Sequence, residues 1–208
     1  MKRASGFLRI VLLVLLLAAV GLPVQAKITK VKDTGLANVA LAPAVTGTWV
    51  KKGGSQRFLQ EDGTWIRNRW IAYEGRIYYL DAKGKRTSGW VRYRGNTYFL
   101  RKNRGLVSGW LSRKGKQYYF GADGAMYHGL QRIDGEQYYF GKKTGAAQSV
   151  WLTLGKHQYF FDTETYRMKK SCWVKIGKKH YYVGKKGKKR RGGWLTLGEK
   201  KYYLDTAG

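Results

Sequence analysis

Aromatic and apolar residues recur along most of the chain with a period of 20 to 22 residues. A large apolar residue opens each unit, and counting it as position zero places the markers at Trp49, Trp70, Trp90, Trp110, Leu130, Trp151, Trp173 and Trp194. The steps between the markers vary from 20 to 22 residues, yet a tyrosine follows every marker but the first at an interval of eight. The pattern therefore predicts eight repeats in which a short rigid segment alternates with a connection of variable length.

The constant interval predicts a β-hairpin with a two-residue turn at positions four and five. Glycine is second in the turn of the first five repeats, which suits a type I′ turn, and first in the last three, which suits type II′. In this register position zero pairs across the hairpin with position nine, and position one pairs with position eight. Trp110 and Tyr119 are then neighbours on one face, while Leu111 and Tyr118 point to the opposite face.

The two faces of the predicted hairpins differ in composition. Positions one, eight and ten are mostly Val, Ile, Leu, Tyr or Phe, so this face is predicted to be the core. The opposite face combines the markers and the aromatic residues of position nine with mostly polar or basic residues at position two. Aromatic rings beside charges on this face are candidates for ligand binding. They are Trp70, Tyr79, Trp90, Phe99, Trp110, Tyr119, Tyr139, Trp151, Phe160, Trp173, Tyr182, Trp194 and Tyr203.

A single two-stranded hairpin is marginally stable in water, so each repeat has to bury apolar surface against its neighbours. We therefore expect an all-β fold, a β-hairpin repeat solenoid of about eight units of 20–22 residues. Glycines near position fourteen are predicted to turn the chain into the next strand, with Thr165 in their place in the sixth repeat. Four aspartates of the connections are explained by turn formation. They are Asp81, Asp123, Asp162 and Asp205.

The N-terminal segment has the form of a signal peptide. Three basic residues are followed by an apolar run of 13 residues, Ile10–Leu22, and Val24-Gln25-Ala26 offers small residues for cleavage. An uncleaved membrane anchor is the alternative, but the run is shorter than the roughly 20 residues of a spanning helix. We expect a signal peptide at 1–26, a flexible spacer at 27–48 and a repeat domain at 49–208. No other stretch is apolar enough to span a bilayer, so the mature chain is expected to be secreted or attached to the cell surface.

The charge of the chain is strongly one-sided. Without the three basic residues of the predicted signal peptide, 38 of the 41 Lys and Arg remain against 12 Asp and Glu, a net charge of +26. Such an imbalance favours an extracellular polyanion: teichoic or lipoteichoic acid, anionic lipid headgroups, an acidic polysaccharide or nucleic acid. A basic surface that only aids solubility is the alternative. One cluster is read either as a phosphate-binding edge or as an exposed basic loop; it contains Lys185, Lys186, Lys188, Lys189, Arg190 and Arg191.

The sequence offers little for catalysis or metal binding. Cys172 is the single cysteine, and the three histidines lie in different repeats without the spacing of metal ligands. No Ser/His/Asp, Cys/His or paired-carboxylate arrangement stands apart from the turns. We therefore expect no cofactor, no metal and no enzymatic activity.

Several segments resemble the cell-wall-binding repeats of Gram-positive surface proteins, a group that includes choline-binding modules, glucan-binding repeats and repeats of large clostridial toxins. The resemblance covers residues 47–208 and is carried by Gly109-Trp110, the run from Gly115 to Phe120, the run from Asp123 to Met126, and Gly129. It implies a superhelical hairpin solenoid with ligand sites between consecutive hairpins, where aromatic side chains hold choline or sugar. It also implies a Gram-positive-type cell wall as the location.

Five position-zero tryptophans match the first cage residue of choline-binding repeats, namely Trp90, Trp110, Trp151, Trp173 and Trp194. Those repeats usually have a second Trp just before the Tyr-Tyr pair, whereas this slot, position seven, holds Gln56, Ile77, Thr97, Gln117, Gln137, Gln158, His180 and Lys201. Cation–π binding of a quaternary ammonium depends on several converging rings, while Gln, Thr and Lys can hydrogen-bond hydroxyls or phosphates. A glycan or an anionic wall polymer is therefore the preferred ligand, and free choline is expected to compete poorly.

The function predicted from the sequence is noncovalent, non-catalytic attachment to a cell-wall polymer, teichoic acid or polysaccharide. Three alternatives stay open: a choline-binding module, a general polyanion binder that uses charge and stacking, and a structural surface-layer protein whose repeats only assemble. Nucleic acid is the less favoured partner.

Overall fold

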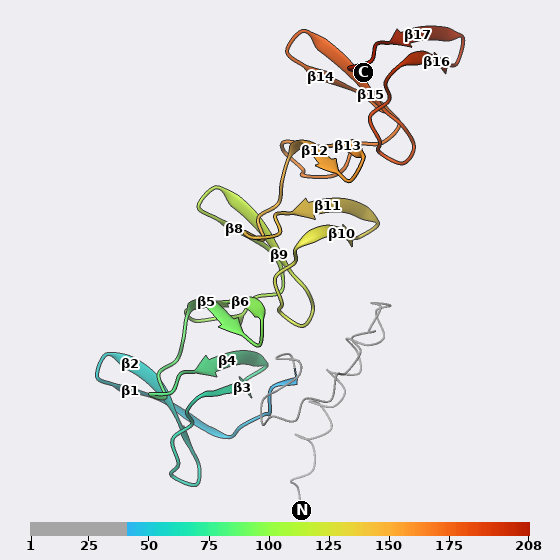
Figure 1. Cartoon of the computed structure of the whole chain (residues 1–208). Coiled ribbons are helices and arrows are strands. Elements are labelled where there is room, and N and C mark those ends of the chain that lie inside the picture. Colours follow the sequence, from blue (N-terminus) through green and yellow to red (C-terminus); the bar gives the residue numbers. More distant parts are fainter. Residues whose placement is uncertain (1–40) are drawn as a thin grey trace, which may run out of the picture. The chain divides into compact units, whose positions relative to one another are not determined.

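The computed structural model describes residues 41–208, which form eight antiparallel hairpins that follow one another along the chain (Figure 1). They are β1 (Gly47–Lys52) with β2 (Ser55–Gln60), β3 (Arg69–Tyr73) with β4 (Arg76–Leu80), β5 (Gly89–Tyr93) with β6 (Asn96–Arg101), β8 (Gly109–Arg113) with β9 (Lys116–Phe120), β10 (Gly129–Ile133) with β11 (Glu136–Phe140), β12 (Val150–Leu154) with β13 (His157–Phe161), β14 (Cys172–Ile176) with β15 (Lys179–Val183), and β16 (Gly193–Leu197) with β17 (Lys200–Leu204). A short strand, β7 (Gly105–Leu106), pairs with β6. The predicted hairpin-repeat solenoid is confirmed, and the hairpins are numbered 1 to 8 below.

The hairpin turns have the predicted geometry. In the first five, both turn residues have positive φ, as at Glu74 (φ 48°) and Gly75 (φ 70°), which defines type I′. In the last three only the leading glycine does, as at Gly155 (φ 61°), which fits type II′. The register follows: Trp110 pairs with Tyr119, and Leu111 pairs with Tyr118.

In hairpins 2 to 7 the connection joins its own hairpin to the preceding one through a residue that we call the bridge residue, and Trp65 stands at the equivalent place in hairpin 1. The bridge residue forms a β-bridge with position ten of its own hairpin, while in hairpin 4 the N–H of Met126 donates to the carbonyl of Thr97 in hairpin 3 at 2.8 Å. The next N–H, of Tyr127, donates back to Tyr119 of hairpin 4 at 2.8 Å. These alternating bonds fix how successive hairpins stack. The bridge residues are Trp65, Arg86, Leu106, Met126, Ala147, Met168 and Lys189.

The buried side chains come from both faces of the hairpins, whereas the sequence predicted that one face alone forms the core. Position ten is buried in seven hairpins, as expected, but at position nine Phe58, Phe99, Phe160 and Tyr182 are also buried. The reason is that position three of one hairpin packs on position nine of the hairpin before it. Tyr73 lies 4.8 Å from Phe58 between ring centroids, and the Arg113 guanidinium lies 4.9 Å from the Phe99 ring. Stacking therefore buries parts of both faces of each hairpin.

The last residues of the predicted spacer pair with hairpin 2. The N–H of Val45 donates to the carbonyl of Ala72 and the N–H of Ala72 donates to Pro43, so this segment adds to hairpin 2, and β1 begins at Gly47. The rest of the spacer, together with the predicted signal peptide, lies outside the described residues. Within residues 41–208, no helix has the length and apolar character to cross a membrane.

The connections turn largely as predicted. Seven glycines near position fourteen have φ between 64° and 91°, namely Gly63, Gly84, Gly105, Gly124, Gly145, Gly187 and Gly208. In the sixth repeat the residue with positive φ is Tyr166 (φ 60°), so the expectation for Thr165 is off by one. The carboxylates of Asp81, Asp123 and Asp162 each accept a backbone N–H two residues on, which confirms their role in turns, whereas Asp205 accepts bonds from Gly192 and Gly208 through its backbone carbonyl.

Candidate functional site

Stacking brings the marker tryptophan of one hairpin against the position-eight tyrosine of the next. The ring centroids lie 5.0–5.5 Å apart at interplanar angles of 60–78°, an edge-to-face arrangement. We call each such pair a cage and name it by its tryptophan; in every cage except that of Trp173, the bridge residue of the second hairpin belongs to it as well. The pairs are Trp49–Tyr78, Trp70–Tyr98, Trp90–Tyr118, Trp110–Tyr138, Trp151–Tyr181 and Trp173–Tyr202.

These contacts change the predicted site. The position-eight tyrosines, which the sequence pattern assigned to the core alone, supply the second ring of every cage. Position nine, which was predicted to share the site, packs against the tryptophan of its own hairpin, edge to face for Phe99 at 5.0 Å from Trp90 and tilted at 44° for Tyr79 against Trp70. The register within a hairpin could not reveal this partner, because the tyrosine belongs to the next repeat.

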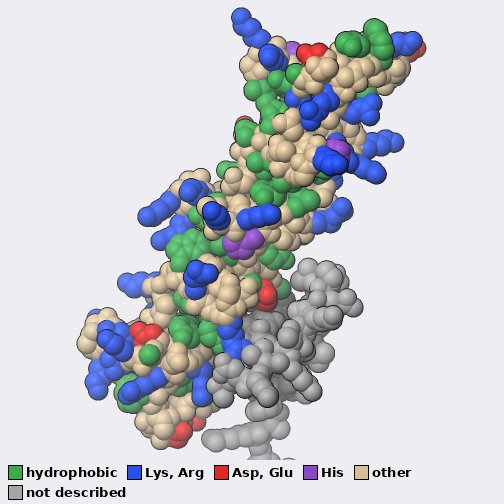
Figure 2. Space-filling view, viewed as in Figure 1, with side chains coloured by type: hydrophobic (Ala, Val, Ile, Leu, Met, Phe, Trp, Pro, Cys, Tyr) green, Lys and Arg blue, Asp and Glu red, His purple; other side chains and the backbone are tan. Residues whose placement is uncertain are grey.

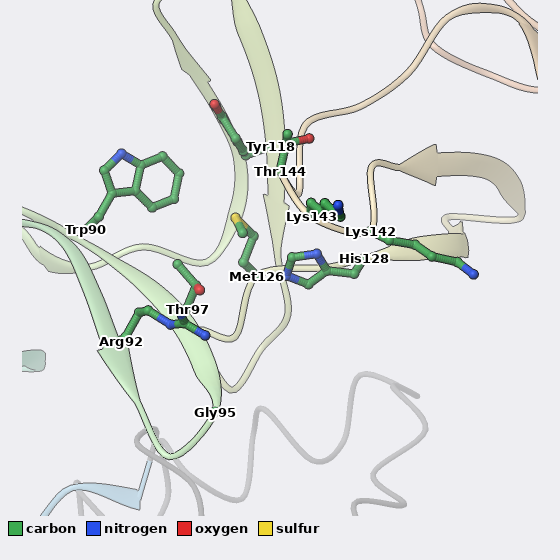
Figure 3. A pocket seen from close by; sticks show the side chains of 10 residues that line it. All are labelled: Trp90, Arg92, Gly95, Thr97, Tyr118, Met126, His128, Lys142, Lys143 and Thr144. Atoms are coloured by element: carbon green, nitrogen blue, oxygen red, sulfur yellow. The ribbon is translucent and has the colours of Figure 1, made fainter.

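The Trp90 cage opens into a cavity of about 750 Å³, within the size range of small-ligand sites. Trp90 itself is 41% exposed. Figure 3 shows Trp90 and Tyr118 on one side, Met126 in the middle, and His128, Lys142 and Lys143 on the other. Three successive repeats contribute, and the residues that line the cavity are Trp90, Arg92, Gly95, Thr97, Tyr118, Met126, His128, Lys142, Lys143 and Thr144.

The lining of this cavity combines apolar and cationic groups. The two rings and the Met126 thioether form an apolar wall, and Thr97 holds the slot where choline-binding repeats have a second Trp. Arg92, Lys142 and Lys143 bring positive charge to the lining, and no acidic side chain lines it. The wider surface agrees, because Lys and Arg side chains are spread along the described face drawn in Figure 2 and few Asp or Glu are visible. The cavity therefore suits a ligand with an apolar or sugar part next to an anionic group.

Two other cages hold a cation from the chain itself. The guanidinium of Arg86 lies 4.9 Å from the ring centroid of Trp49 and 5.8 Å from that of Tyr78. The Nζ of Lys189 lies 5.0 Å from Trp151 and 4.2 Å from Tyr181. Burial lowers the pKa of both groups below their ordinary values, and for Lys189 the nearby Arg191 adds to the lowering.

The predicted ligand-binding residues fall into three groups by exposure. Four are buried and have no free ring face, so they support neighbouring rings: Trp70, Phe99, Phe160 and Tyr182. Tyr79, Tyr119, Tyr139 and Trp151 are half-buried. The exposed ones are Trp90, Trp110, Trp173, Trp194 and Tyr203.

The predicted basic cluster is divided by the fold. Lys189 lies in the Trp151 cage, and the Nζ of Lys188 lies 2.8 Å from Nε2 of His157. Lys185, Lys186, Arg190 and Arg191 are exposed. Only these four therefore present an exposed basic edge.

Comparison with known proteins gives the class of this fold. Residues 88–105, 108–126 and 192–208 match the family model described as "Putative cell wall binding repeat". Three of the eight hairpin repeats therefore match this family, which confirms the resemblance seen in the sequence. A search among curated proteins finds no match.

Solved structures of the same fold come from Streptococcus pneumoniae. CbpJ from strain TIGR4 has a TM-score of 0.70 and 24% identity, over 78% of this chain and 57% of CbpJ. Choline binding protein F, crystallised with a peptidoglycan analogue, has a TM-score of 0.68 and 25% identity, over 78% of this chain and 56% of that one. The choline-binding domain of CbpL has a TM-score of 0.55 and 23% identity, over 79% and 96%. The chain thus spans just over half the length of the first two.

Proposed function

We propose that this protein is an extracellular, non-catalytic binding module that attaches noncovalently to a phosphate-bearing cell-wall polymer such as teichoic acid. The observation that carries the proposal is the Trp90 cavity, which places exposed rings beside Arg92, Lys142 and Lys143. Its repeats are of the cell-wall-binding type, and choline binding protein F was crystallised with a peptidoglycan analogue.

In this proposal the two parts of the cavity bind different parts of the polymer. A sugar ring or alkyl group packs on Trp90, Tyr118 and Met126, where burial of apolar surface contributes most of the local affinity. Phosphate oxygens accept hydrogen bonds from the nearby guanidinium and ammonium groups. Because the polymer repeats and so do the cages, several weak contacts combine into firm attachment.

Choline is the second candidate ligand. It is favoured by Arg86 and Lys189, because both show that a cation fits between the tryptophan and tyrosine of a cage in this chain. It is disfavoured by Thr97, which stands in the slot of the second Trp and removes one aromatic wall. Elution with choline distinguishes the two candidates.

The test of the proposed function is retention on purified Gram-positive cell walls before and after chemical removal of teichoic acid. We expect removal to abolish most of the binding. We expect Trp90→Ala to weaken binding to untreated walls several-fold, since it deletes one wall of the cavity. Ile176→Ala is the matched control, because Ile176 is exposed to the same degree, 40% against 41% for Trp90, and lies outside the cavity lining.

Thermal melts of both variants accompany the binding assay, because Trp90 also stabilises the stack through its contact with Tyr118. Undiminished binding to stripped walls would contradict a teichoic acid ligand. Equal binding by Trp90→Ala and the native chain would exclude the Trp90 cavity as the contact site.

A further inference from the structure

The bridge residues share a backbone setting but differ widely in their side chains. The N–H groups of Arg86, Met126 and Lys189 donate to the position-seven carbonyls of Gln56, Thr97 and Gln158 at 2.7–2.8 Å. At this one position of the repeat, the side chain ends in a guanidinium at Arg86, a thioether at Met126 and an ammonium at Lys189. The side chain of the bridge residue therefore lies beside the tryptophan and tyrosine rings of its cage.

The stems of these side chains are held in place by the next connection. A Cβ atom on Gly208 would lie 2.7 Å from Cε of Lys189, and a Cβ atom on Gly145 would overlap the end of Met126. The two long side chains thus pack in equivalent places, each against a glycine without a side chain. The Trp90 and Trp151 cages therefore differ in the end group of the bridge residue, which is a neutral thioether in Met126 and an ammonium in Lys189.

That difference determines whether a cage has room for a ligand. In the Trp151 cage, Nζ of Lys189 lies 4.2 Å from the Tyr181 ring and 5.0 Å from the Trp151 ring, within the range of a cation–π contact. In the Trp49 cage, Arg86 lies over both rings and its Nη2 donates to Oδ1 of Asn103 at 3.2 Å. In the Trp90 cage, Met126 is neutral and borders the open cavity.

We propose that Arg86 and Lys189 are intramolecular ligands that close the Trp49 and Trp151 cages, so that the bridge residue selects which cages accept an external ligand. A tethered ligand acts at an effective concentration of about millimolar or more, so an external cation has to exceed that concentration to displace it. The link from cage closure to wall attachment rests on the proposed function; the closure itself does not.

Closure is tested without cell walls, by NMR of the Trp indole N–H signals during titration with tetramethylammonium chloride. In the native chain the Trp151 signal is expected not to move. In Lys189→Met it moves saturably, because methionine is native at the equivalent position 126 and leaves the cage open. Lys186→Met is the matched control, since it removes the same charge from an exposed neighbour and leaves the Trp151 signal unresponsive.

A second measurement needs no variant. The Nζ of Lys189 lies over two rings, so the resonances of the adjacent ε-methylene protons are expected upfield of those of Lys185 and Lys186. Coincident resonances, or a Trp151 signal in the native chain that responds as strongly as in Lys189→Met, would overturn the inference.

The wall assay then separates closure from the proposed function. Met126→Lys adds a positive charge but places an ammonium in the open cage, so wall retention is expected to fall several-fold; binding driven by charge alone would rise. Retention lost in Trp90→Ala but kept in Met126→Lys would reject the bridge residue as the selector. Retention unchanged in Trp90→Ala would exclude the Trp90 cavity as the contact site, and undiminished binding to stripped walls would reject the teichoic acid ligand, while the NMR result for Lys189 still decides closure.

Discussion

At the scale of single residues, Asp162 shows how the connections are held. Its carboxylate accepts hydrogen bonds from the backbone N–H groups of Glu164 and Thr165 and pairs with Nζ of Lys169 at 2.9 Å. These bonds, led by the N–H of Thr165, hold the pKa of Asp162 far below its ordinary value of 3.8. Because the folded state prefers the ionised form, the carboxylate stabilises the fold above pH 4 and loses this effect as pH falls through its folded pKa.

Asp162→Asn is expected to lower the free energy of unfolding by about 1 kcal/mol at pH 7, since a charged acceptor of several hydrogen bonds becomes a neutral one and solvent screens part of the loss. Denaturant titrations at pH 7, 5 and 3 measure the effect. The difference from the native chain should be equal at pH 7 and pH 5 and should shrink only in stronger acid. Glu199→Gln, which removes a charge from an exposed turn, serves as the control. A difference that already vanishes at pH 5 would contradict this role for the carboxylate.

At the scale of elements, the sixth connection differs from the others. Its positive-φ residue is Tyr166, although a side chain there is strained. Elsewhere the equivalent residue is glycine, and at Gly124, Gly145, Gly187 and Gly208 a Cβ would meet the long bridge residue of the preceding connection; at Gly187 it would lie 2.8 Å from Cε of Met168. The bridge residue that precedes Tyr166 is Ala147, and both pack against the cluster of buried residues that contains Phe140. The short side chain of the bridge residue Ala147 therefore leaves room for the large side chain of Tyr166 in the next connection.

This pairing predicts a coupled effect of two substitutions. Ala147→Met alone is expected to destabilise the protein by about 1–3 kcal/mol, because it overfills the space that Tyr166 occupies. Tyr166→Gly alone should also destabilise it, since the space is left unfilled. The double variant restores the Met–Gly combination found at Met126 and Gly145, so its loss should be smaller than the sum of the two. Denaturant unfolding of the four proteins gives the coupling free energy, and strictly additive losses would contradict the pairing.

The sequence was sufficient to predict each hairpin, because a two-residue turn and an interval of eight allow a single register. It was not sufficient to predict the cages. Tyr118 reaches Trp90 only through the bonds of Met126 to Thr97, and nothing in the periodicity specifies how one hairpin rests on the next. The charge pattern also grouped Lys189 with its exposed neighbours, since a side chain that folds back over two rings has no signature in composition.

At the scale of the whole molecule, the proposed function has charge and cages act together on a repeating ligand. The chain carries 41 Lys and Arg against 12 Asp and Glu, so attraction to a polyanion is the sum of many exposed contacts. The exposed cages add local contacts, and three of them, at Trp90, Trp110 and Trp173, have tryptophans exposed by 37–41%. In the proposed function, charge gives long-range attraction to the wall, and the cages give specificity for what the polymer carries.

This division of roles predicts how the protein leaves the wall. Salt shortens the Debye length from about 10 Å at 0.1 M to about 3 Å at 1 M, so a sodium chloride gradient should elute the bound protein. Choline chloride should elute it at nearly the same ionic strength, because the open cage has Thr97 where a second Trp would strengthen cation–π binding, worth about 0.5–2 kcal/mol per contact. Basic groups around the cavity, such as Arg92, repel a quaternary ammonium as well.

Parallel gradients of the two salts on the same wall preparation make the comparison, with tetramethylammonium chloride as a third arm that lacks the hydroxyl of choline. Because several cages act on one polymer, any intrinsic preference for choline would be multiplied across the sites and would separate the gradients clearly. Release by choline well below the ionic strength at which sodium chloride acts would contradict the prediction. Choline held between the rings of the open cages would then be the main attachment, with the positive charge in a supporting role.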